Sequence, residues 1–214
     1  TVSSAATNPE AAPDSTLVRH LAAMQERPGV TDLAWRYSKE TVSGAEVVTA
    51  FPEAQFAAPD ALAEAVAYHD AHRGLGLLIW HDGRLVGKHL NESFDVDQHF
   101  ASYSMHKSLL ALVTIAALED GLIGSLDDPV GQYIDEWSRE PRGHITLRQL
   151  LTHTSGLQHF AMGGQSPQAA NLVLSSKVTE TALSFELEGE PGSRFNYNNV
   201  NSQLAGIALE RALA

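Results

Sequence analysis

The order of hydrophobic and polar positions predicts a chain that is mostly helical, with one β-hairpin in its first half. Residues 17–27 have the spacing of a short helix, which the Pro-Gly pair after them would end. A second helix is expected to begin at Pro59, with Leu62 and Val66 on its apolar side. Residues 1–16 are rich in Ala, Ser, Thr and Pro, and we expect them to be flexible. They lack the basic region and apolar core of an intact signal peptide, which leaves a mobile leader or a mature end after cleavage.

Two β-type runs, LGLLIW and RLVGKHL, flank the pair Asp82-Gly83. This arrangement is typical of a tight hairpin, because glycine accepts the positive φ that such a turn needs. We expect His81 and Asp82 at the tip. The side chains expected to face the core are Leu77, Ile79, Leu85 and Val86.

The second half of the chain reads as a series of helices. Residues 104–118 are apolar almost all round, which predicts a helix buried on every side and ended by Gly121. Thr146 is expected to cap the next helix, which Ser155-Gly156 would close. The remaining expectations are a loop at 158–170, a helix at 178–187 and an amphipathic helix at 200–213.

Composition narrows the functional classes. The chain has 214 residues, of which 43% are hydrophobic, so it can form a core. Its net charge of −12 disfavours electrostatic binding to nucleic acid or to an anionic membrane. It has no cysteine, which excludes disulfides, thiol catalysis and thiolate metal sites. The compartment stays open between periplasmic or secreted and cytoplasmic, because a protein without disulfides fits either.

The stretch SMHKS holds a candidate catalytic pair, Ser104 and Lys107. Residues three apart lie on the same face of a helix, so Oγ and Nζ can come within hydrogen-bond reach. A serine hydroxyl becomes a nucleophile when a neighbouring base takes its proton, and burial can make a lysine such a base. The alternative is an ordinary helix cap, which needs no catalytic role.

A second polar element, Tyr197-Asn198-Asn199, follows a Pro-Gly turn. A tyrosine can relay a proton between a serine and a leaving group, and an asparagine amide can hold a lysine or a substrate. The alternative is that Tyr197 packs in the core and that the two asparagines serve the turn.

Together with SMHKS, the segments LRQLLTHTSGL and PGSRFNYNNVNSQLAGIALE resemble the serine β-lactamase-like family. That family includes class C β-lactamases, DD-peptidases, related esterases and 6-aminohexanoate-dimer hydrolase. The resemblance covers about residues 75–214. It implies an α/β (α+β) fold of the β-lactamase/transpeptidase type, with an antiparallel sheet flanked by helices and a helical region.

The resemblance also implies roles for individual residues. Ser104 would be the acylated nucleophile, Lys107 its base partner and Tyr197 the general acid and base. Asn199 would be the motif asparagine at the substrate, and the backbone N–H of Ser104 would form half of the oxyanion hole. The reaction would pass through an acyl-enzyme resolved by water, and no metal or organic cofactor is implied.

The histidines suggest a different chemistry. His69 and His72 are spaced i, i+3, and His153 and His159 follow later. No carboxylates surround them in a metal-ligand pattern, so we expect no metal site. The histidine of HTSGL looks structural in the family, and His106 is expected to point away from Ser104. A metal-dependent hydrolase that uses these histidines remains a rival interpretation.

No counterpart of the family's third motif, a Lys/His-Thr/Ser-Gly triad on a late strand, follows Tyr197. We therefore expect residues 1–60 to be a leader and irregular extension, and residues 61–214 to be a catalytic domain that carries the first hairpin and the helical region. The missing strands could come from a second chain. The sequence could also be truncated, or the protein could be a naturally short form that only binds. An apolar helix without a covering sheet would expose a large apolar surface.

The expected function is hydrolysis of a small-molecule ester, amide or peptide by acyl transfer. An esterase or amidase is favoured over an antibiotic-resistance enzyme, because relatives with the LLTHTSGL segment span several substrate classes. The alternative is a non-catalytic protein of the same fold that binds a peptide or acyl ligand.

Overall fold

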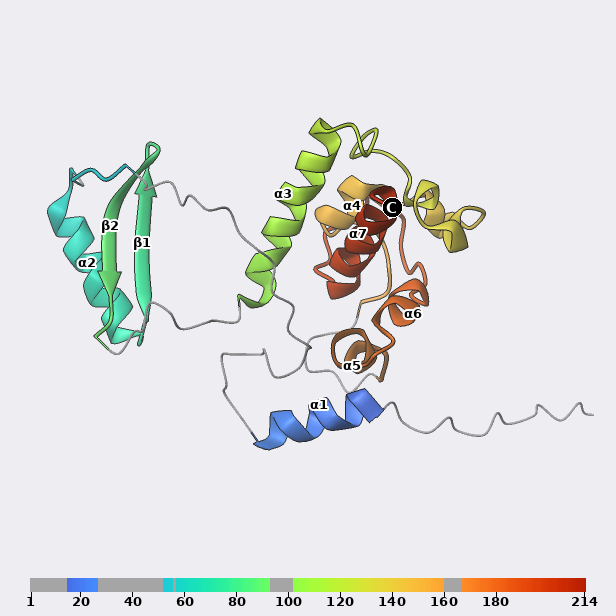
Figure 1. Cartoon of the computed structure of the whole chain (residues 1–214), viewed down its shortest axis with the longest axis horizontal. Coiled ribbons are helices and arrows are strands. Elements are labelled where there is room, and N and C mark those ends of the chain that lie inside the picture. The colour runs from blue at the N-terminus through green and yellow to red at the C-terminus, as the bar shows by residue number, and fades with distance from the viewer. Residues whose placement is uncertain (1–14, 27–51, 56, 93–101, 160–166) are drawn as a thin grey trace, which may run out of the picture. The chain divides into compact units, whose positions relative to one another are not determined.

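The computed structural model describes residues 15–26, 52–55, 57–92, 102–159 and 167–214. They belong to two compact units (Figure 1). One unit comprises Thr1–Val30 with Ser102–Ala214, and the other comprises Thr31–Ala101. The flexibility expected for residues 1–16 lies outside the described residues up to residue 14, and it is wrong for Ser15 and Thr16, which begin a helix. The proposed domain boundary at residue 60 stays a prediction.

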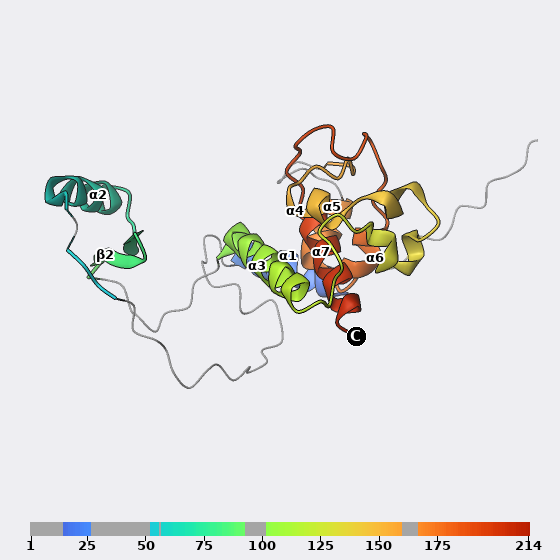
Figure 2. The same ribbon diagram turned by 90° about the horizontal axis from the view of Figure 1, so that it is seen from above.

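The smaller unit is a helix on a hairpin, as Figures 1 and 2 show. Helix α2 (Pro59–Ala71) begins with the expected proline, and strands β1 (Gly76–His81) and β2 (Arg84–Leu90) pair antiparallel. Asp82 and Gly83 both have positive φ, 49° and 74°, which is the geometry of a type I′ turn. The predicted hairpin is confirmed, and so is the prediction that its turn lies at His81 and Asp82.

One face of the hairpin packs on α2. Leu77 and Ile79 are half-buried, while the alternate residues Leu78 and Trp80 are exposed. The expected inward-facing set is therefore correct for β1, and Leu85 and Val86 of β2 are half-buried as well. Gly87 pairs with Ile79, and a Cβ added at Gly87 would lie 2.9 Å from Cδ1 of Leu62. The absence of a side chain at Gly87 lets α2 approach the strands closely.

The larger unit is helical. Its helices are α1 (Ser15–Glu26), α3 (His106–Glu119), α4 (Leu147–Leu151), α5 (Pro167–Leu174), α6 (Val178–Leu183) and α7 (Asn199–Ala212). The described residues between α2 and α4 form four 3₁₀ turns: η2 (Tyr103–Met105), η3 (Val130–Gln132), η4 (Asp135–Trp137) and η5 (Pro141–His144). Helix α7 lies at the centre and packs against α3, α4 and α6 (Figure 1). Its buried Val200, Leu204 and Ala208 meet a core that includes Trp137 and Phe185.

Several of the expected helices form close to their expected limits. Thr146 caps α4 with a full capping box. Its side chain accepts a hydrogen bond from the backbone N–H of Gln149, and the Gln149 side chain accepts one from the backbone N–H of Thr146. The helix expected at 178–187 ends earlier, at Leu183, since Phe185 is buried and Leu187 bridges to Leu157. The loop expected at 158–170 is wrong at its end, where α5 begins at Pro167.

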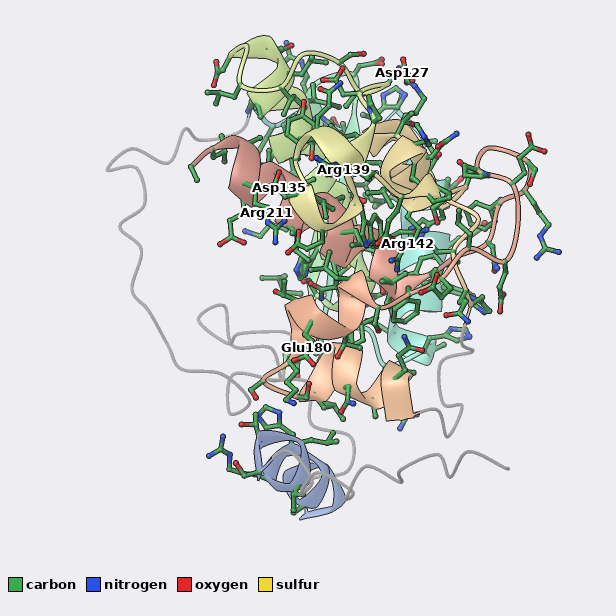
Figure 3. All side chains as sticks on the ribbon, turned by 90° about the vertical axis from the view of Figure 1, so that its right-hand side faces the viewer. Asp127, Asp135, Arg139, Arg142, Glu180 and Arg211 are labelled. Atoms are coloured by element: carbon green, nitrogen blue, oxygen red, sulfur yellow. The ribbon has the colours of Figure 1, made fainter. Side chains whose placement is uncertain are left out.

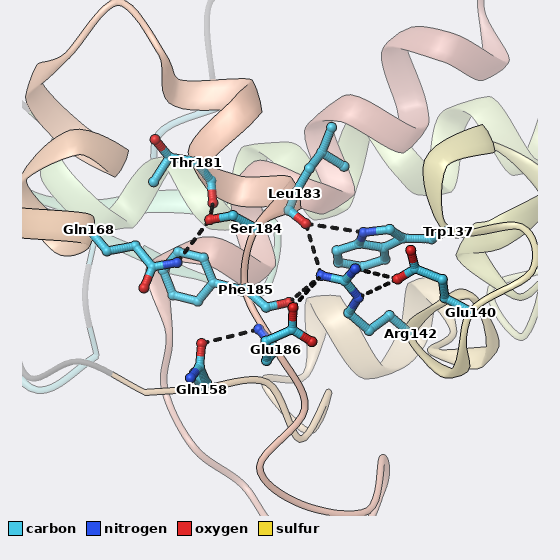
Figure 4. Close-up of polar contacts among 10 residues, drawn as sticks. All are labelled: Trp137, Glu140, Arg142, Gln158, Gln168, Thr181, Leu183, Ser184, Phe185 and Glu186. Carbon is cyan, nitrogen blue, oxygen red and sulfur yellow. Dashed lines mark hydrogen bonds and ion pairs between the residues drawn. The ribbon is translucent and has the colours of Figure 1, made fainter. Parts of the chain in front are cut away.

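Arg142 fastens the end of α6 to the turns that precede α4 (Figure 4). Its guanidinium donates to the backbone oxygens of Leu183 (3.0 Å) and Phe185 (2.9 Å), and it pairs with the carboxylate of Glu140. It also lies over the Trp137 ring, 4.9 Å from the centroid. The buried carbonyls at the C-terminal end of α6 are thereby satisfied.

A bidentate ion pair holds the C-terminal end of α7. Arg211 donates to both oxygens of Glu136, at 2.5 and 2.9 Å, and Figure 3 shows Arg211 beside Asp135 of the same turn. The hydrogen bonds from Arg211 lower the pKa of Glu136 to about 2. The pair's contribution to stability is therefore complete above the carboxyl's ordinary pKa of 4.5 and is lost as the pH falls through about 2.

The prediction that α3 is buried on every side is wrong. Only Thr114 and Ala117 are buried, whereas Leu109 and Leu112 are 61% and 62% exposed. Among the described residues of its own unit, α7 packs on one side of α3, and Leu109 and Leu112 lie on the side that these residues leave exposed. The expectation of exposed apolar surface is thus confirmed on this side of α3. None of the described helices, α3 with its 14 residues included, is long and apolar enough to cross a membrane.

Candidate active site

Ser104 lies at the entrance to α3, in the short turn η2. The residue before it, Tyr103, has a φ of 47°, a left-handed conformation that a non-glycine residue adopts only under constraint. The N-cap of α3 is Met105, and no side-chain cap bond forms there. Ser104 therefore does not act as the cap of α3, and its exposed hydroxyl is available for other contacts.

Lys107 and Tyr197 both meet the Ser104 hydroxyl. Nζ of Lys107, in the first turn of α3, donates to Oγ of Ser104 at 3.0 Å, as the i, i+3 spacing predicted. The phenolic O–H of Tyr197 donates to the same oxygen at 2.7 Å. Nζ of Lys107 also lies 5.3 Å from the centroid of the Tyr197 ring. The structure thus brings together all three residues for which proton transfer was expected.

The charge of Lys107 changes the acidity of Tyr197. Burial alone would raise the pKa of Tyr197, but hydrogen bonding to Lys107 and Ser104 and the positive charge of Lys107 outweigh it. The pKa of Tyr197 consequently lies below its ordinary value of 10.0. A lower pKa increases the fraction of Tyr197 present as phenolate at a given pH, and the phenolate is the form that can accept the proton of an adjacent hydroxyl.

The segment that carries Tyr197 is held by the HTSGL segment. Backbone N–H groups of Glu188, Gly192 and Asn196 donate to carbonyl oxygens of Gly156 (2.9 Å), Thr154 (2.7 Å) and His153 (2.8 Å). The bonds run side by side along the two segments. These main-chain hydrogen bonds fix the segment that carries Tyr197 beside the HTSGL segment.

His153 supports Tyr197 from below the ring. The two rings lie 4.5 Å apart and are tilted by 34°. Nδ1 of His153 accepts from the backbone N–H of Asn198 (3.2 Å), and the Asn201 amide lies 3.3 Å from the same nitrogen. Because an amide N–H can only donate, Nδ1 is the acceptor and the ring proton of the neutral form is on Nε2. Burial and the charge of Lys107 lower the pKa of His153, which favours this neutral form.

This contact is what sequence reasoning missed about His153. The HTSGL histidine was expected to be structural, and no local spacing connects it with Tyr197. Its φ of 57° is a conformation that histidine tolerates better than most residues. The buried Asn201 extends the support, because the hydroxyl of Ser155 donates to its Oδ1 at 2.6 Å.

Among the other predicted site residues, Asn199 is the half-buried first residue of α7, two positions after Tyr197. The neighbouring Asn198 is buried and caps α7, accepting from the Val200 N–H and donating to the Gln158 carbonyl. The turn role weighed for the asparagines therefore belongs to Asn198. The substrate role of Asn199 and the oxyanion role of the Ser104 N–H stay predictions.

The remaining histidines of this region lie apart from the three-residue cluster. Nδ1 of His106 lies 3.3 Å from the hydroxyl of Ser102, so its polar contact is with a different serine from Ser104. His159 is exposed. Neither is among the groups that could jointly hold a metal ion in the described part of the chain.

Comparison with known proteins assigns the sequence to one family model. Residues 59–214 match the family model described as Beta-lactamase. Protein flp of Staphylococcus aureus (strain NCTC 8325 / PS 47) is 26% identical over 165 residues, which are 69% of this chain and 32% of that protein. Monacolin J acid methylbutanoyltransferase of Aspergillus terreus is 29% identical over 134 residues, 51% of this chain and 31% of that one.

Solved structures share the fold. A protein assigned as a 6-aminohexanoate-dimer hydrolase from Bacillus anthracis superposes with a TM-score of 0.61 at 19% identity, covering 77% of this chain and 49% of its own. A protein assigned as a β-lactamase from Bacteroides dorei gives a TM-score of 0.56 at 26% identity, and the match covers 72% of this chain and 46% of that one. The chain thus spans about half the length of these structures and about a third of the curated relatives.

Proposed function

The chain belongs to the beta-lactamase family, and on that premise we propose that Ser104 is the nucleophile of an enzyme that cleaves an ester or amide by acyl transfer. The observation that carries the proposal is the double contact on Oγ of Ser104. A lysine ammonium and a phenol both lie within hydrogen-bond distance of it, at 3.0 and 2.7 Å. A serine that served only as a helix cap or turn residue would not need two titratable partners on its hydroxyl.

The contacts suggest a division of roles between the two partners. Lys107 keeps its positive charge close to Tyr197 and so favours the phenolate, which takes the hydroxyl proton as Oγ attacks the carbonyl carbon. The C–O bond to Ser104 forms as the carbonyl π electrons move to oxygen. Tyr197 then returns its proton to the departing alcohol or amine as the bond to that group breaks. Water resolves the acyl-enzyme by the same exchange in reverse.

The negative charge that develops on the carbonyl oxygen of the substrate needs hydrogen-bond donors to stabilise it. We assign the backbone N–H of Ser104 as one of them, at the entrance to a helix where the dipole favours negative charge. Asn199 supplies an amide near Tyr197 for the substrate or the lysine. The exposed side of α3 belongs to the same proposal, and we expect strands to cover it in the active enzyme, either from a second chain or from further residues of a longer chain.

For the substrate class we favour an open-chain ester or amide over a β-lactam. One relative is named as a hydrolase of 6-aminohexanoate dimer and another as a methylbutanoyltransferase. Both names describe cleavage or formation of an acyl bond outside a lactam ring. The alternative function is a protein that binds a peptide or acyl ligand without reacting with it.

Labelling with a fluorophosphonate tests the proposal, because the reagent reacts with activated serine hydroxyls. The full chain is treated, denatured and weighed intact, and the modified peptide is sequenced by tandem mass spectrometry. We expect one adduct, on Ser104, that is absent from Ser104→Ala. Ser108→Ala is the matched control, since Ser108 is exposed in the first turn of α3, four residues after Ser104, and it should label like the wild type.

A folded protein that takes up no label would contradict the catalytic role and favour the binding alternative. Circular dichroism on the same samples establishes that each variant is folded. Hydrolysis of a nitrophenyl ester and of a chromogenic β-lactam, measured in parallel, then separates the two substrate classes.

A further inference from the structure

Two histidines and an aspartate meet in the smaller unit, on the face of the hairpin that packs against α2. Nδ1 of His69 lies 3.0 Å from Oδ1 of Asp70, and Nε2 of His89 lies 2.9 Å from the same oxygen. The rings of His69 and His89 meet edge to face at 5.3 Å. The three potential ligand atoms all lie within 4.8 Å of one another.

Strand geometry explains why His89 arrives there. His89 pairs with Leu77, and Gly87 pairs with Ile79, so these residues share one face of the hairpin. This is the face on which Gly87 contacts Leu62 of α2. His89 therefore points toward α2, where His69 and Asp70 occupy the last turn.

The expectation that no carboxylate accompanies the histidines is corrected at this point. It considered His69 with His72, and the structure separates the two. Nδ1 of His72 bonds to the carbonyl of Tyr68 at 2.8 Å, and its ring stacks on the Tyr68 ring. The partner of His69 is Asp70, and the second imidazole comes from β2.

We propose that His69, Asp70 and His89 form a binding site for one divalent first-row transition metal ion, such as Zn²⁺. Two imidazoles and one carboxylate are ligands that such ions accept. A tetrahedral Zn²⁺ ion with bonds of about 2.1 Å holds its donor atoms about 3.4 Å apart. The distances of 3.0 and 2.9 Å from Asp70 Oδ1 to the two ring nitrogens are those of hydrogen bonds, and side-chain movements of a few tenths of an ångström would widen them to that separation.

Burial holds His69 in this orientation. Its side chain is 10% exposed, and its Nε2 is buried without a hydrogen-bond partner among the described residues. Gly74 allows this position, because a Cβ there would lie 2.3 Å from that Nε2. Nδ1 is accordingly the nitrogen that His69 presents to the other two groups.

The other two ligands keep the site open to solvent. The side chains of Asp70 and His89 are 46% and 31% exposed, so an ion can enter and water can complete its coordination. A bound ion would join the C-terminal end of α2 to β2. The site lies in a different unit from Ser104, and its existence does not depend on the proposed acyl transfer.

Zinc titration of the untagged full chain by calorimetry tests the proposal. We expect binding of one equivalent with micromolar affinity, weakened by at least about tenfold in Asp70→Asn and in His89→Gln. His81→Gln is the matched control, because His81 belongs to an exposed histidine–aspartate pair, 3.4 Å from Asp82, on the same hairpin. Its affinity should equal that of the wild type.

A second measurement uses the wild type alone and so avoids any folding defect of a variant. In ¹⁵N–¹H spectra of the imidazoles, zinc should shift Nδ1 of His69 and Nε2 of His89 and leave His81 unchanged. Equal zinc affinity in all four proteins, absence of stoichiometric binding, or shifts confined to other histidines would each overturn the site. Such results would leave the three residues as a hydrogen-bonded link between α2 and β2.

Discussion

The phenolic oxygen of Tyr197 lies 2.7 Å from Oγ of Ser104, although 93 positions of sequence separate the two residues. Lys107, in the first turn of the helix that begins two residues after the serine, completes the group. This hydrogen bond connects the start of α3 with the segment just before α7, and these two helices pack against each other. The proposed chemistry at Ser104 would therefore depend on the packing of the helical unit.

Tyr197→Phe should slow fluorophosphonate labelling of Ser104 by about 10²–10⁴-fold, because it removes the group that accepts the serine proton. The rate is measured by intact mass against time. Tyr133→Phe is the control, since it also removes one hydroxyl, which donates to Asp128 at 2.7 Å, and it should label at the wild-type rate. Equal rates in both variants would exclude Tyr197 from proton transfer.

The labelling rate should rise with pH and level off below pH 10. In the proposed mechanism the phenolate of Tyr197 is the reactive form, and its pKa lies below 10.0 because contacts with Lys107 and Ser104 outweigh the effect of burial. In Lys107→Met the midpoint should move upward and the rate at neutral pH should fall, since the positive charge is lost.

Lys177→Met is the matched control for this pH profile. Lys177 is an exposed lysine that pairs with Glu180 at 4.0 Å. Its profile should coincide with that of the wild type. A downward shift of the midpoint in Lys107→Met would contradict the role given to the lysine charge.

His153→Asn should impair the site through Tyr197. Asparagine tolerates the positive φ at this position, so the variant removes the ring beneath Tyr197 and the Nδ1 acceptor with little backbone strain. We expect slower labelling and a loss of about 1–3 kcal/mol in the free energy of unfolding, because the Asn198 N–H loses its partner. Urea denaturation measures the stability of this variant, and His144→Asn at an exposed position is its control.

The pH dependence of stability gives a second readout for His153. Its pKa is lowered in the folded protein by burial and by Lys107. The unfolded chain therefore binds the proton more readily, and this contribution to stability is complete above about pH 6.5 and is lost as the pH falls through the lower folded pKa. The difference in unfolding free energy between wild type and His153→Asn should narrow on acidification. A difference in unfolding free energy that does not change with pH would argue that Nδ1 of His153 does not contribute to this difference.

Gly156→Ala should lower the free energy of unfolding by at least about 2 kcal/mol. Gly156 has a φ of 73°, and an added Cβ would lie 2.3 Å from the carbonyl oxygen of Gly189. Gly206→Ala offers the opposite case, because this glycine lies inside α7 with nothing within 4 Å of the added Cβ. It should raise stability by about 0.5–1 kcal/mol. Thermal and urea unfolding of both variants compare the two glycines directly.

The sequence by itself determined the features that depend on neighbours along the chain. Asp82-Gly83 specified the hairpin turn, Thr146 with Gln149 specified the capping box, and the i, i+3 spacing of Ser104 and Lys107 set their contact. In each case the distance follows from the geometry of one turn of backbone. Family resemblance added Tyr197, which local geometry could not have connected with Ser104.

The tertiary structure decided the contacts between distant segments. His153 lies against Tyr197, and His89 reaches Asp70, because helices and strands far apart in sequence pack together. The exposure of α3 was decided in the same way, since hydrophobicity predicts that a helix can be buried but does not supply the surface that buries it. Which residues meet across a fold depends on the packing of many side chains at once, and no short stretch of sequence contains that information.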